Sequence, residues 1–432
     1  MRLEFHGAAR EVGRSCIELT TLKGSRFLLD LGVKFSERGL IFPEKVLNIS
    51  EIDGVFISHA HLDHSGGLPL FEHNHLKGPI FCTAQTLSAT KILLKDSYKI
   101  ARIKHQHPIY NNADLRDVNK DARLVNYDVW YSHKDIKFMF LNAGHIPGSA
   151  MILIEADNKR LLYTGDFNNR DTHLLHHEII DPVLREKPLD VLITESTYGY
   201  RDLPNTEELE KKLITSIKKT ISNGGSIIMP VFSLGRAQQL LIMLSKAKIN
   251  TKIFFDGMCN KLTRKMLETP SKYIKNKETL YDAFYNKVEW VSSEKRRKDA
   301  MKNQGIFITT SGMLQGGPVL SYVKEMWHDE RNKIILMGFQ CKRTNGRHLI
   351  DEGFLYLDGW KTYVKCEVEK YDFSGHADNE GIKKIVTELN PKHVFFQHGD
   401  EESVLTLKEW ADTTLKGKNN HAPKIGDVFD IK

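Results

Sequence analysis

Cysteine is scarce in this sequence and is never closely paired. The 432 residues include five cysteines, and none of them belongs to a CxxC motif. Disulfide frameworks and thiolate zinc sites both depend on paired cysteines, so the sequence disfavours both. We expect reduced, mostly buried thiols in a cytoplasmic protein.

Long hydrophobic runs are also missing. No apolar stretch approaches the roughly 18 residues that a membrane-spanning helix needs. The start, MRLEFHGAAREVGRSC, has no basic segment that leads into an apolar core and a cleavage site. A soluble protein of two or three domains is therefore expected, with no membrane partner. The net charge of +7 is compatible with a polyanionic partner but does not identify one.

Hydrophobic periodicity predicts an α/β fold. Up to about residue 197 the chain is rich in strands, such as GVFIS (54–58) and DVLITEST (190–197). From about residue 206, strands such as GSIIMPV and KIFFD alternate with helical segments, which is typical of a parallel sheet. Strands and a short helix return from about residue 353.

The segment SHAHLDHSGGLP (58–69) crowds four metal-binding side chains, His59, His61, Asp63 and His64, into a loop that follows a predicted strand. Imidazole and carboxylate groups are good ligands for zinc-like ions. His59 and His61 alternate on one side, whereas Asp63 and His64 can reach a second point, so two ions a few ångströms apart are expected. The alternative is a polar surface turn, which separate metal-capable groups elsewhere disfavour.

Two such groups also follow predicted strands: His145 in NAGHIPGSA and Asp166 in LLYTGDF. Taken singly, each is a weak signal, because a histidine after a strand is more often a capping or core residue. Together with HAHLDH, and with Asp30 upstream in FLLDLG, they resemble the metallo-β-lactamase superfamily in order along the chain. That resemblance implies an αββα sandwich that holds two zinc ions.

The same resemblance implies roles for these residues. It assigns one ion to His59, His61 and His145, the other to Asp63 and His64, and a bridging position to Asp166. Asp30 would orient the ligand imidazoles or the loop amides.

Three later motifs resemble the β-CASP nucleases of this superfamily: ITESTYG with Glu195, YDFSGHAD with His376 and FFQHGD with His398. The segments VFSLGRAQQLL, TTSGMLQGGP and GFQCKRTNGR are also similar to that family. One departure is the stretch at 342–345, which is more basic than in most relatives. We therefore expect residues 1–199 to form the first part of the sandwich, 200–347 an inserted β-CASP domain with a parallel sheet, and 348–432 the last part of the sandwich.

The resemblance implies a zinc-dependent ribonuclease. Two cations would activate a water for attack on a phosphodiester, giving a 5′-phosphate and a 3′-hydroxyl. His398 would complete the shell of the second ion, and Asp63 beside that ion is counted with the catalytic residues. His376 would protonate the leaving group, and Glu195 would orient His376. The alternatives are that Glu195 caps a helix and that His376 supports the ligands from a distance.

Substrate contacts are expected in the inserted domain. Ser233, Arg236 and Ser311 follow strands, where amides and hydroxyls can hold phosphate oxygens, and Arg347 would add charge. The alternative is that these residues belong to ordinary connections between a strand and a helix and have no role in binding. Single-stranded RNA is the expected substrate, because the related DNA-processing enzymes generally lack a histidine at the position of His398.

Endonuclease cleavage is preferred because the chain resembles the short forms related to the cleavage and polyadenylation endonuclease, without KH modules or the C-terminal extension of ribonuclease J. A 5′-to-3′ exoribonuclease, a DNA-repair nuclease, a small ester or thioester hydrolase and a non-catalytic RNA-binding subunit are the alternatives. A homodimer is expected at the level of the family.

Overall fold

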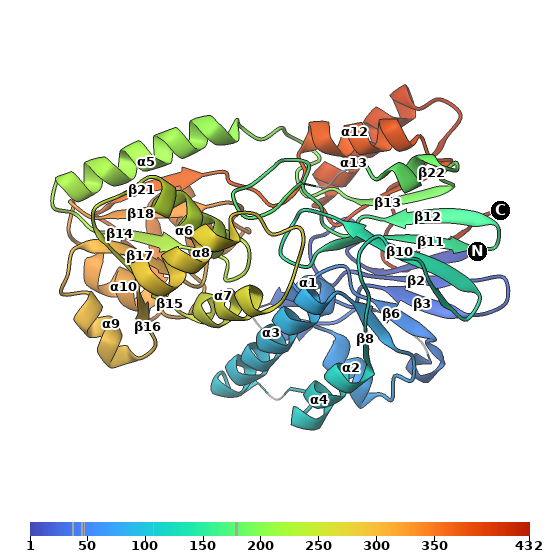
Figure 1. Cartoon of the computed structure of the whole chain (residues 1–432), viewed down its shortest axis with the longest axis horizontal. Helices are drawn as coiled ribbons and strands as arrows, with labels where there is room; N and C mark the ends of the chain where they lie inside the picture. The colour runs from blue at the N-terminus through green and yellow to red at the C-terminus, as the bar shows by residue number, and fades with distance from the viewer. Residues whose placement is uncertain (37–38, 45, 47, 107, 178–179) are drawn as a thin grey trace.

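The computed structural model describes residues 1–432 apart from 37–38, 45, 47, 107 and 178–179. Two seven-stranded sheets make up the right-hand body in Figure 1, and a six-stranded sheet makes up the left-hand body. The N- and C-termini meet at the right edge, where the first and last strands pair.

The first sheet has the order β24–β1–β2–β3–β6–β7–β8. Its strands are β1 (Arg2–Gly7), β2 (Cys16–Thr20), β3 (Arg26–Leu29), β6 (Gly54–Phe56), β7 (Ile80–Cys82), β8 (Ala122–Leu124) and β24 (Val428–Asp430). From β3 to β8 the strands run parallel, so their C-terminal ends share one edge of the sheet.

The second sheet has the order β23–β22–β13–β12–β11–β10–β9. Its strands are β9 (Tyr131–His133), β10 (Ile136–Asn142), β11 (Ala150–Ala156), β12 (Lys159–Tyr163), β13 (Val191–Glu195), β22 (His393–Gln397) and β23 (Asn419–His421). The four strands from β12 to β23 in this order run parallel. Their C-terminal ends therefore present their loops at a common edge.

Aromatic side chains from both sheets fill the space between them. Phe27 and Phe56 of the first sheet are fully buried against Phe138 and Phe395 of the second. The rings of Phe56 and Phe138 lie 4.8 Å apart in an edge-to-face arrangement. Burial of such large apolar side chains is the main stabilising term in folding, and it holds the two sheets face to face.

Helices cover the outer faces of both sheets. Leu28, Val55 and Ile80 of the first sheet pack against the helices that follow β6 and β7, whereas Val394 and Phe396 of the second sheet pack against the C-terminal helices. These helices are α1 (Leu62–Ser65), α2 (Leu68–His73), α3 (Ala84–Ile103), α4 (Asn112–Asp121), α12 (Asn379–Leu389) and α13 (Glu401–Thr414). Short elements in the connections are β4 (Lys34–Ser36), β5 (Gly39–Ile41), η1 (Ile49–Glu51) and η2 (Pro182–Arg185).

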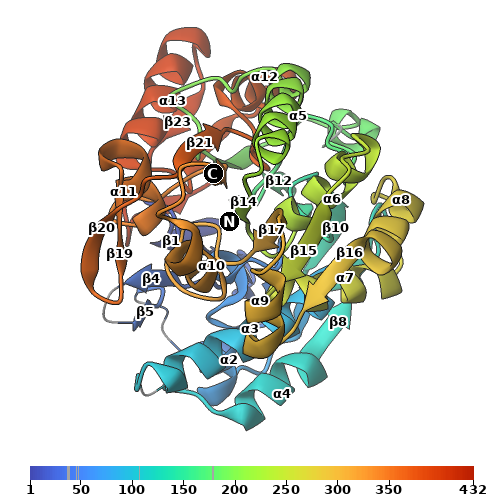
Figure 2. The ribbon, with the colours of Figure 1, turned by 90° about the vertical axis from the view of Figure 1, so that its left-hand side faces the viewer.

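The third sheet is wholly parallel, in the order β16–β15–β17–β14–β18–β21. Its strands are β14 (Ile227–Pro230), β15 (Lys252–Asp256), β16 (Val288–Val291), β17 (Gly305–Thr309), β18 (Lys333–Met337) and β21 (Glu367–Tyr371). The two views together show helices on both of its faces (Figures 1 and 2).

The helices of this body are α5 (Thr206–Ser222), α6 (Arg236–Lys246), α7 (Met258–Glu268), α8 (Lys277–Asp282), the π-helix η3 (Ala283–Lys287), α9 (Glu294–Ala300), α10 (Val319–Met326) and α11 (Asn345–Glu352). A hairpin of β19 (Phe354–Leu357) and β20 (Trp360–Tyr363) follows α11. No helix in the described part of the chain has the length and apolar character needed to cross a bilayer.

This architecture confirms the predicted α/β fold, an αββα sandwich with an inserted parallel-sheet domain. The parallel sheet takes its last strand, β21, from residues beyond 347, where the insert was expected to end. The domain limits remain a prediction. Because β21 pairs with β18, we propose that the insert extends from about residue 200 to about residue 372.

Candidate active site

The loop after β6 is held by one buried carboxylate. Asp30 accepts hydrogen bonds from the backbone N–H of Ser58 at 2.7 Å and from the Ser58 hydroxyl at 2.7 Å. It also accepts from Nδ1 of His64 and from the Tyr163 hydroxyl, both at 2.6 Å. The bond to Nδ1 leaves Nε2 of His64 available to a ligand, which is the orienting role expected of Asp30.

The remaining predicted groups come from the second sheet. His145 follows β10, Asp166 follows β12, Glu195 ends β13 and His398 follows β22 directly. All four are at least nine-tenths buried. Nδ1 of His145 donates to the carbonyl oxygen of Gly375 at 2.7 Å, so its Nε2 is free to face the first loop.

The structure brings all seven predicted metal ligands together. Their ligand atoms fall into three overlapping groups, and the atoms of each group lie within 4.8 Å of one another. The groups are His59, His61, His145 and Asp166; His59, Asp63 and His64; and His64, Asp166 and His398. Oδ2 of Asp166 lies 3.5 Å from Nε2 of His59 and 3.4 Å from Nε2 of His64. Oδ1 of the same carboxylate lies 3.2 Å from Nδ1 of His398. Asp166 therefore occupies the position between the groups.

The donor atoms suit divalent cations of the zinc type. Nε2 of His59, Oδ1 of Asp166 and Nδ1 of His398 are buried without a hydrogen-bond partner, which is rare for buried polar atoms. Nε2 of His145 also lies 3.1 Å from Nδ1 of His61. Two imidazole lone pairs at that distance repel each other unless a proton or a cation lies between them. Imidazole nitrogens and carboxylate oxygens are the ligands that zinc prefers among such groups.

The protonation states of three histidines in the cluster also suit a metal site. Burial and the neighbouring imidazoles lower the pKa of His59 and of His145, and burial lowers the pKa of His61 to about 4. These histidines are neutral at pH 7, and neutral imidazole is the form that binds metal. Burial also acts on His64, but the charges of Asp166 and Asp30 outweigh it and raise the pKa of His64.

Glu195 and His376 form a pair beside the cluster. The carboxylate of Glu195 is fully buried; one oxygen accepts from the Phe167 N–H at 2.8 Å, and the other lies 2.9 Å from Nδ1 of His376. Nδ1 of His376 also lies 3.8 Å from Asp166. Burial alone would lower the pKa of His376, but Glu195 and Asp166 raise it to about 9. The imidazolium form is thus favoured at neutral pH.

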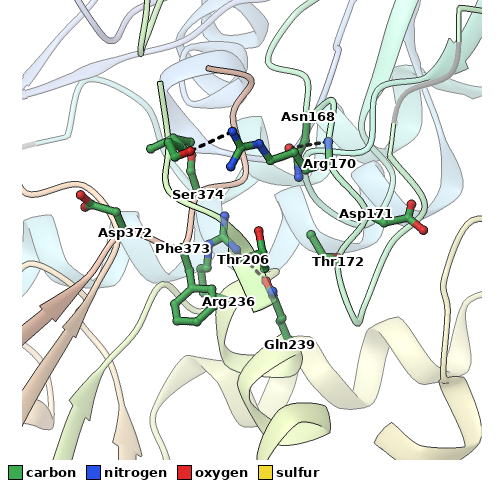
Figure 3. Close-up of a pocket in the computed structure, with 11 residues that line it drawn as sticks. Asn168, Arg170, Asp171, Thr172, Thr206, Arg236, Gln239, Asp372, Phe373 and Ser374 are labelled. Carbon is green, nitrogen blue, oxygen red and sulfur yellow. Dashed lines mark hydrogen bonds between the residues drawn. The ribbon is translucent and has the colours of Figure 1, made fainter. Parts of the chain in front are cut away.

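Arg236 lies next to the same site. A methyl group placed on Gly375 would be 3.0 Å from Nη2 of Arg236 and 3.1 Å from Nδ1 of His145, so both side chains flank this glycine. Figure 3 shows Arg236 and Gln239 lining a pocket, where the guanidinium donates to Oε1 of Gln239 at 2.6 Å. Burial lowers the pKa of Arg236 to about 10, and no carboxylate in the described part of the chain pairs with it.

The other predicted phosphate contacts are less directly placed. The Ser233 carbonyl accepts from Gln238, and the Ser311 hydroxyl donates to the carbonyl of Gly316 within its own loop. Arg347 lies on the exposed side of α11 and pairs with Asp351 at 2.6 Å. The structure therefore brings Arg236 close to His145 of the metal cluster and places Arg347 in an ion pair on α11.

Sequence reasoning missed several supporting residues. Tyr163 and Ser58 hold Asp30, and the only signal for them is their position immediately before TGD and HAH. Cys341 was placed only in a family motif. Burial and the carboxylates of Asp63 and Asp400 raise its pKa to about 11.

Three family models match the chain. The "Metallo-beta-lactamase superfamily domain" matches residues 19–197, the "Beta-Casp domain" residues 237–349, and the "Zn-dependent metallo-hydrolase RNA specificity domain" residues 363–423. A crystal structure of a protein of unknown function from Enterococcus faecalis has a TM-score of 0.62 at 15% identity and covers 99% of each chain, which supports the fold.

Curated archaeal proteins are similar along the whole chain. "Probable RNase MJ4" of Methanocaldococcus jannaschii is 38% identical and covers 100% of both chains. "RNase J-like protein" of the same organism is 34% identical and covers 96% of both. "RNase aCSPSF2" of Saccharolobus solfataricus is 31% identical over 94% of this chain and 81% of its own length.

The fold and the donor atoms at its strand ends define a metal-dependent hydrolase with the metallo-β-lactamase fold. The full-length similarity to the archaeal proteins narrows this class. The chain belongs to the β-CASP family of the metallo-β-lactamase superfamily.

Proposed function

We propose that this β-CASP protein is a zinc-dependent endoribonuclease that hydrolyses phosphodiester bonds in single-stranded RNA and leaves 5′-phosphate and 3′-hydroxyl ends. The observation that carries the proposal is the Glu195–His376 pair beside a cluster of seven metal-capable side chains. Such a combination provides ligands for cations and, separately, a proton donor. The names of the full-length relatives, which are called ribonucleases, support RNA as the substrate.

Two zinc ions per chain fit the division of the cluster. One would be held by His59, His61 and His145, and the other by Asp63, His64 and His398, with Asp166 between them. Bound cations of this kind supply an activated water and neutralise the charge that builds on a phosphodiester. Asp30 would keep His64 in the tautomer that presents Nε2 to the site.

His376 is proposed as the general acid. Glu195 accepts from Nδ1, so the proton on Nε2 is the one available to a leaving 3′-oxygen. A pKa raised to about 9 keeps that proton in place at neutral pH before the reaction. Asp63, whose side chain is 30% exposed, would position the reacting water in addition to binding the second ion.

Arg236 is proposed to bind the phosphate next to the scissile bond. Its guanidinium is half-buried close to His145 without a carboxylate partner in the described part of the chain, and a cation in such a setting is stabilised by an anion. Ser233 and Ser311 are proposed as neighbouring phosphate contacts, and Arg347 as a contact farther from the cluster.

The test uses purified protein with internally labelled single-stranded RNA, RNA labelled at its 5′ end, single-stranded DNA and a generic thioester, each with and without chelator. We expect RNA alone to be cut, with internal fragments appearing before mononucleotides. Release of mononucleotides from the 5′ end would support the 5′-to-3′ exonuclease alternative. Turnover of DNA or thioester in preference to RNA would overturn the substrate assignment.

A homodimer remains a proposal that rests on the family resemblance. Sedimentation equilibrium of the protein tests it, because a single species with the mass of one chain would contradict it.

A further inference from the structure

The hairpin of β19 and β20 presents exposed aromatic rings together with a cation. In its register Phe354 faces Tyr363 and Tyr356 faces Lys361, so these four side chains share one face of the hairpin. Tyr356 is 47% exposed and Tyr363 is 59% exposed. Nζ of Lys361 lies 3.9 Å from the centre of the Phe354 ring and 5.3 Å from that of Tyr363. His348 of α11 stacks on Phe354 at 4.9 Å. These five residues are called the aromatic face below.

The opposite side of the hairpin is anchored in the domain core. Leu355 is fully buried and Leu357 nearly so, in the same cluster as Leu349 of α11. Because strand side chains alternate between faces, Tyr356, Lys361 and Tyr363 point to solvent on the other side. Phe354 lies on that side too, but it is buried and supports the exposed rings and the Lys361 ammonium group. Cross-strand pairing of tyrosines stabilises a hairpin, but that role does not require rings that remain about half exposed.

The aromatic face is hydrogen-bonded to the start of α11. The side-chain amide of Asn345 donates to the carbonyls of Leu314 and Tyr356 at 3.0 and 3.1 Å, and its oxygen accepts from the Tyr356 N–H at 2.9 Å. Asn345 begins α11, and in the connection before it the ring of Phe339 lies 6.1 Å from that of Tyr198, whose ring lies 6.3 Å from that of His376. Figure 2 shows α11 directly beside β19 and β20. A short stretch of chain therefore connects the metal cluster to the aromatic face.

The charges along this stretch favour an anionic ligand. Lys342, Arg343 and Lys361 form no ion pair with any described residue, and all three side chains are exposed. The acidic groups nearby are already paired: Asp351 with Arg347, Glu352 with His348 and Asp358 with Lys324. The exposed Arg347–Asp351 pair contributes little stability, so a phosphate can replace the carboxylate there.

We propose that the aromatic face docks single-stranded RNA, whose bases stack on Tyr356 and Tyr363 while its phosphates follow Lys342, Arg343 and Arg347 to the active site. This inference rests on the proposed function and adds a second contact region outside the cluster. Aromatic rings accept any unpaired base, and interspersed cations follow the backbone. The rings would not increase the affinity for duplex RNA, because its bases are already stacked on each other.

The experiment compares the Tyr356→Ala/Tyr363→Ala variant with the wild-type protein and with Tyr281→Ala. Tyr281 is a matched control because it is a 55% exposed tyrosine on α8 of the same domain. Binding is measured by fluorescence anisotropy with unstructured RNAs of about 6 and about 20 nucleotides, and cleavage is measured separately. A Tyr356→Phe/Tyr363→Phe variant keeps the rings and removes the hydroxyls.

We expect the double alanine variant to weaken binding of the longer RNA about tenfold or more, with less than about twofold change for the shorter RNA. The phenylalanine variant should retain wild-type affinity, and Lys342→Ala/Arg343→Ala should reduce the salt dependence of binding. If the double alanine variant binds the longer RNA as tightly as the Tyr281 control does, the inference is wrong, and a protein ligand for this face becomes the alternative. RNA that binds but is never cut would overturn the proposed function alone.

Discussion

Nδ1 of His376 lies 2.9 Å from the buried carboxylate of Glu195, although the two residues are separated by 181 positions in the sequence. Glu195 ends a central strand of the sandwich, whereas His376 lies just after the last strand of the inserted sheet. The pair therefore joins the end of a sandwich strand to the segment where the chain returns from the inserted sheet.

Replacement of His376 by alanine should lower kcat for RNA cleavage by roughly 10²- to 10⁴-fold, because the leaving oxygen loses its general acid. Metal content should remain at the wild-type level, since the seven proposed ligands are unchanged. Cleavage kinetics and elemental analysis of the same preparation measure both quantities. Glu195→Gln should show a smaller loss of kcat in the same direction.

His177→Ala is the matched control, because His177 is a 42% exposed histidine on a connecting loop. It should cleave RNA at the wild-type rate. Full activity of His376→Ala would remove the general-acid assignment, and loss of metal from that variant would instead make His376 a ligand.

Substitution of Asp166 should disturb both metal positions at once. The carboxylate lies within reach of His59, His64 and His398, so Asp166→Ala removes a ligand that both ions would share. We expect two zinc ions per wild-type chain, fewer than two in the variant, and no detectable RNA cleavage in the variant. The control is Asp171→Ala, which replaces a 49% exposed aspartate farther along the same connection. Wild-type protein that cuts RNA at full rate after exhaustive chelation would contradict the metal requirement.

The sequence predicted the cluster because each ligand motif follows a strand. His64 and His398 are 334 positions apart, yet their Nε2 atoms lie 3.2 Å from each other. His64 follows β6 of the first sheet and His398 follows β22 of the second, so the loops at the C-terminal ends of strands from both sheets converge even when the chain between them is long. Strand periodicity together with family motifs was sufficient for this part of the fold and site.

Other features depend on packing that a single sequence does not encode locally. The sequence pattern predicts Tyr163 as an aromatic core residue of a strand. Its hydroxyl nevertheless donates a hydrogen bond to Asp30 at 2.6 Å. Arg347 is predicted to bind phosphate, and its sequence context does not reveal that its guanidinium pairs with Asp351 one helical turn away. The membership of β21 in the inserted sheet follows from its pairing with β18, which no periodicity predicts.

Arg236→Ala should weaken substrate binding more than it slows the chemical step. The guanidinium lies beside the cluster without a carboxylate partner, so its loss removes a charge-assisted contact to phosphate. We expect KM for RNA to rise about tenfold, with Arg236→Lys intermediate because it keeps the charge but not the planar group. Arg331→Ala, at a 67% exposed position, is the control. Unchanged KM in Arg236→Ala would exclude it as a phosphate contact.

A buried carboxyl far from the active site gives a prediction for stability. Glu72 of α2 is 9% exposed, one of its oxygens has no hydrogen-bond partner, and Asp114, Asp117 and Asp121 of α4 lie around it. Burial and these negative charges raise the pKa of Glu72 to about 8, and the neighbouring His73 is bound to Asp114. A raised folded-state pKa means that the folded protein holds this proton more tightly than the unfolded chain does.

The contribution of Glu72 is therefore fully present below its unfolded pKa of about 4.3 and is lost as the pH rises through about 8. Glu72→Gln keeps the side chain neutral at every pH. At pH 9 the variant should be more stable than the wild type by roughly 2 kcal/mol, after allowance for solvent screening, and the difference should vanish near pH 4. Thermal melts at both pH values measure this, with Glu294→Gln, at a 76% exposed position, as the control. An equal shift of the melting temperature at both pH values would show that the pKa of Glu72 is the same in the folded and the unfolded protein, because stability depends on pH only where the two states bind different numbers of protons.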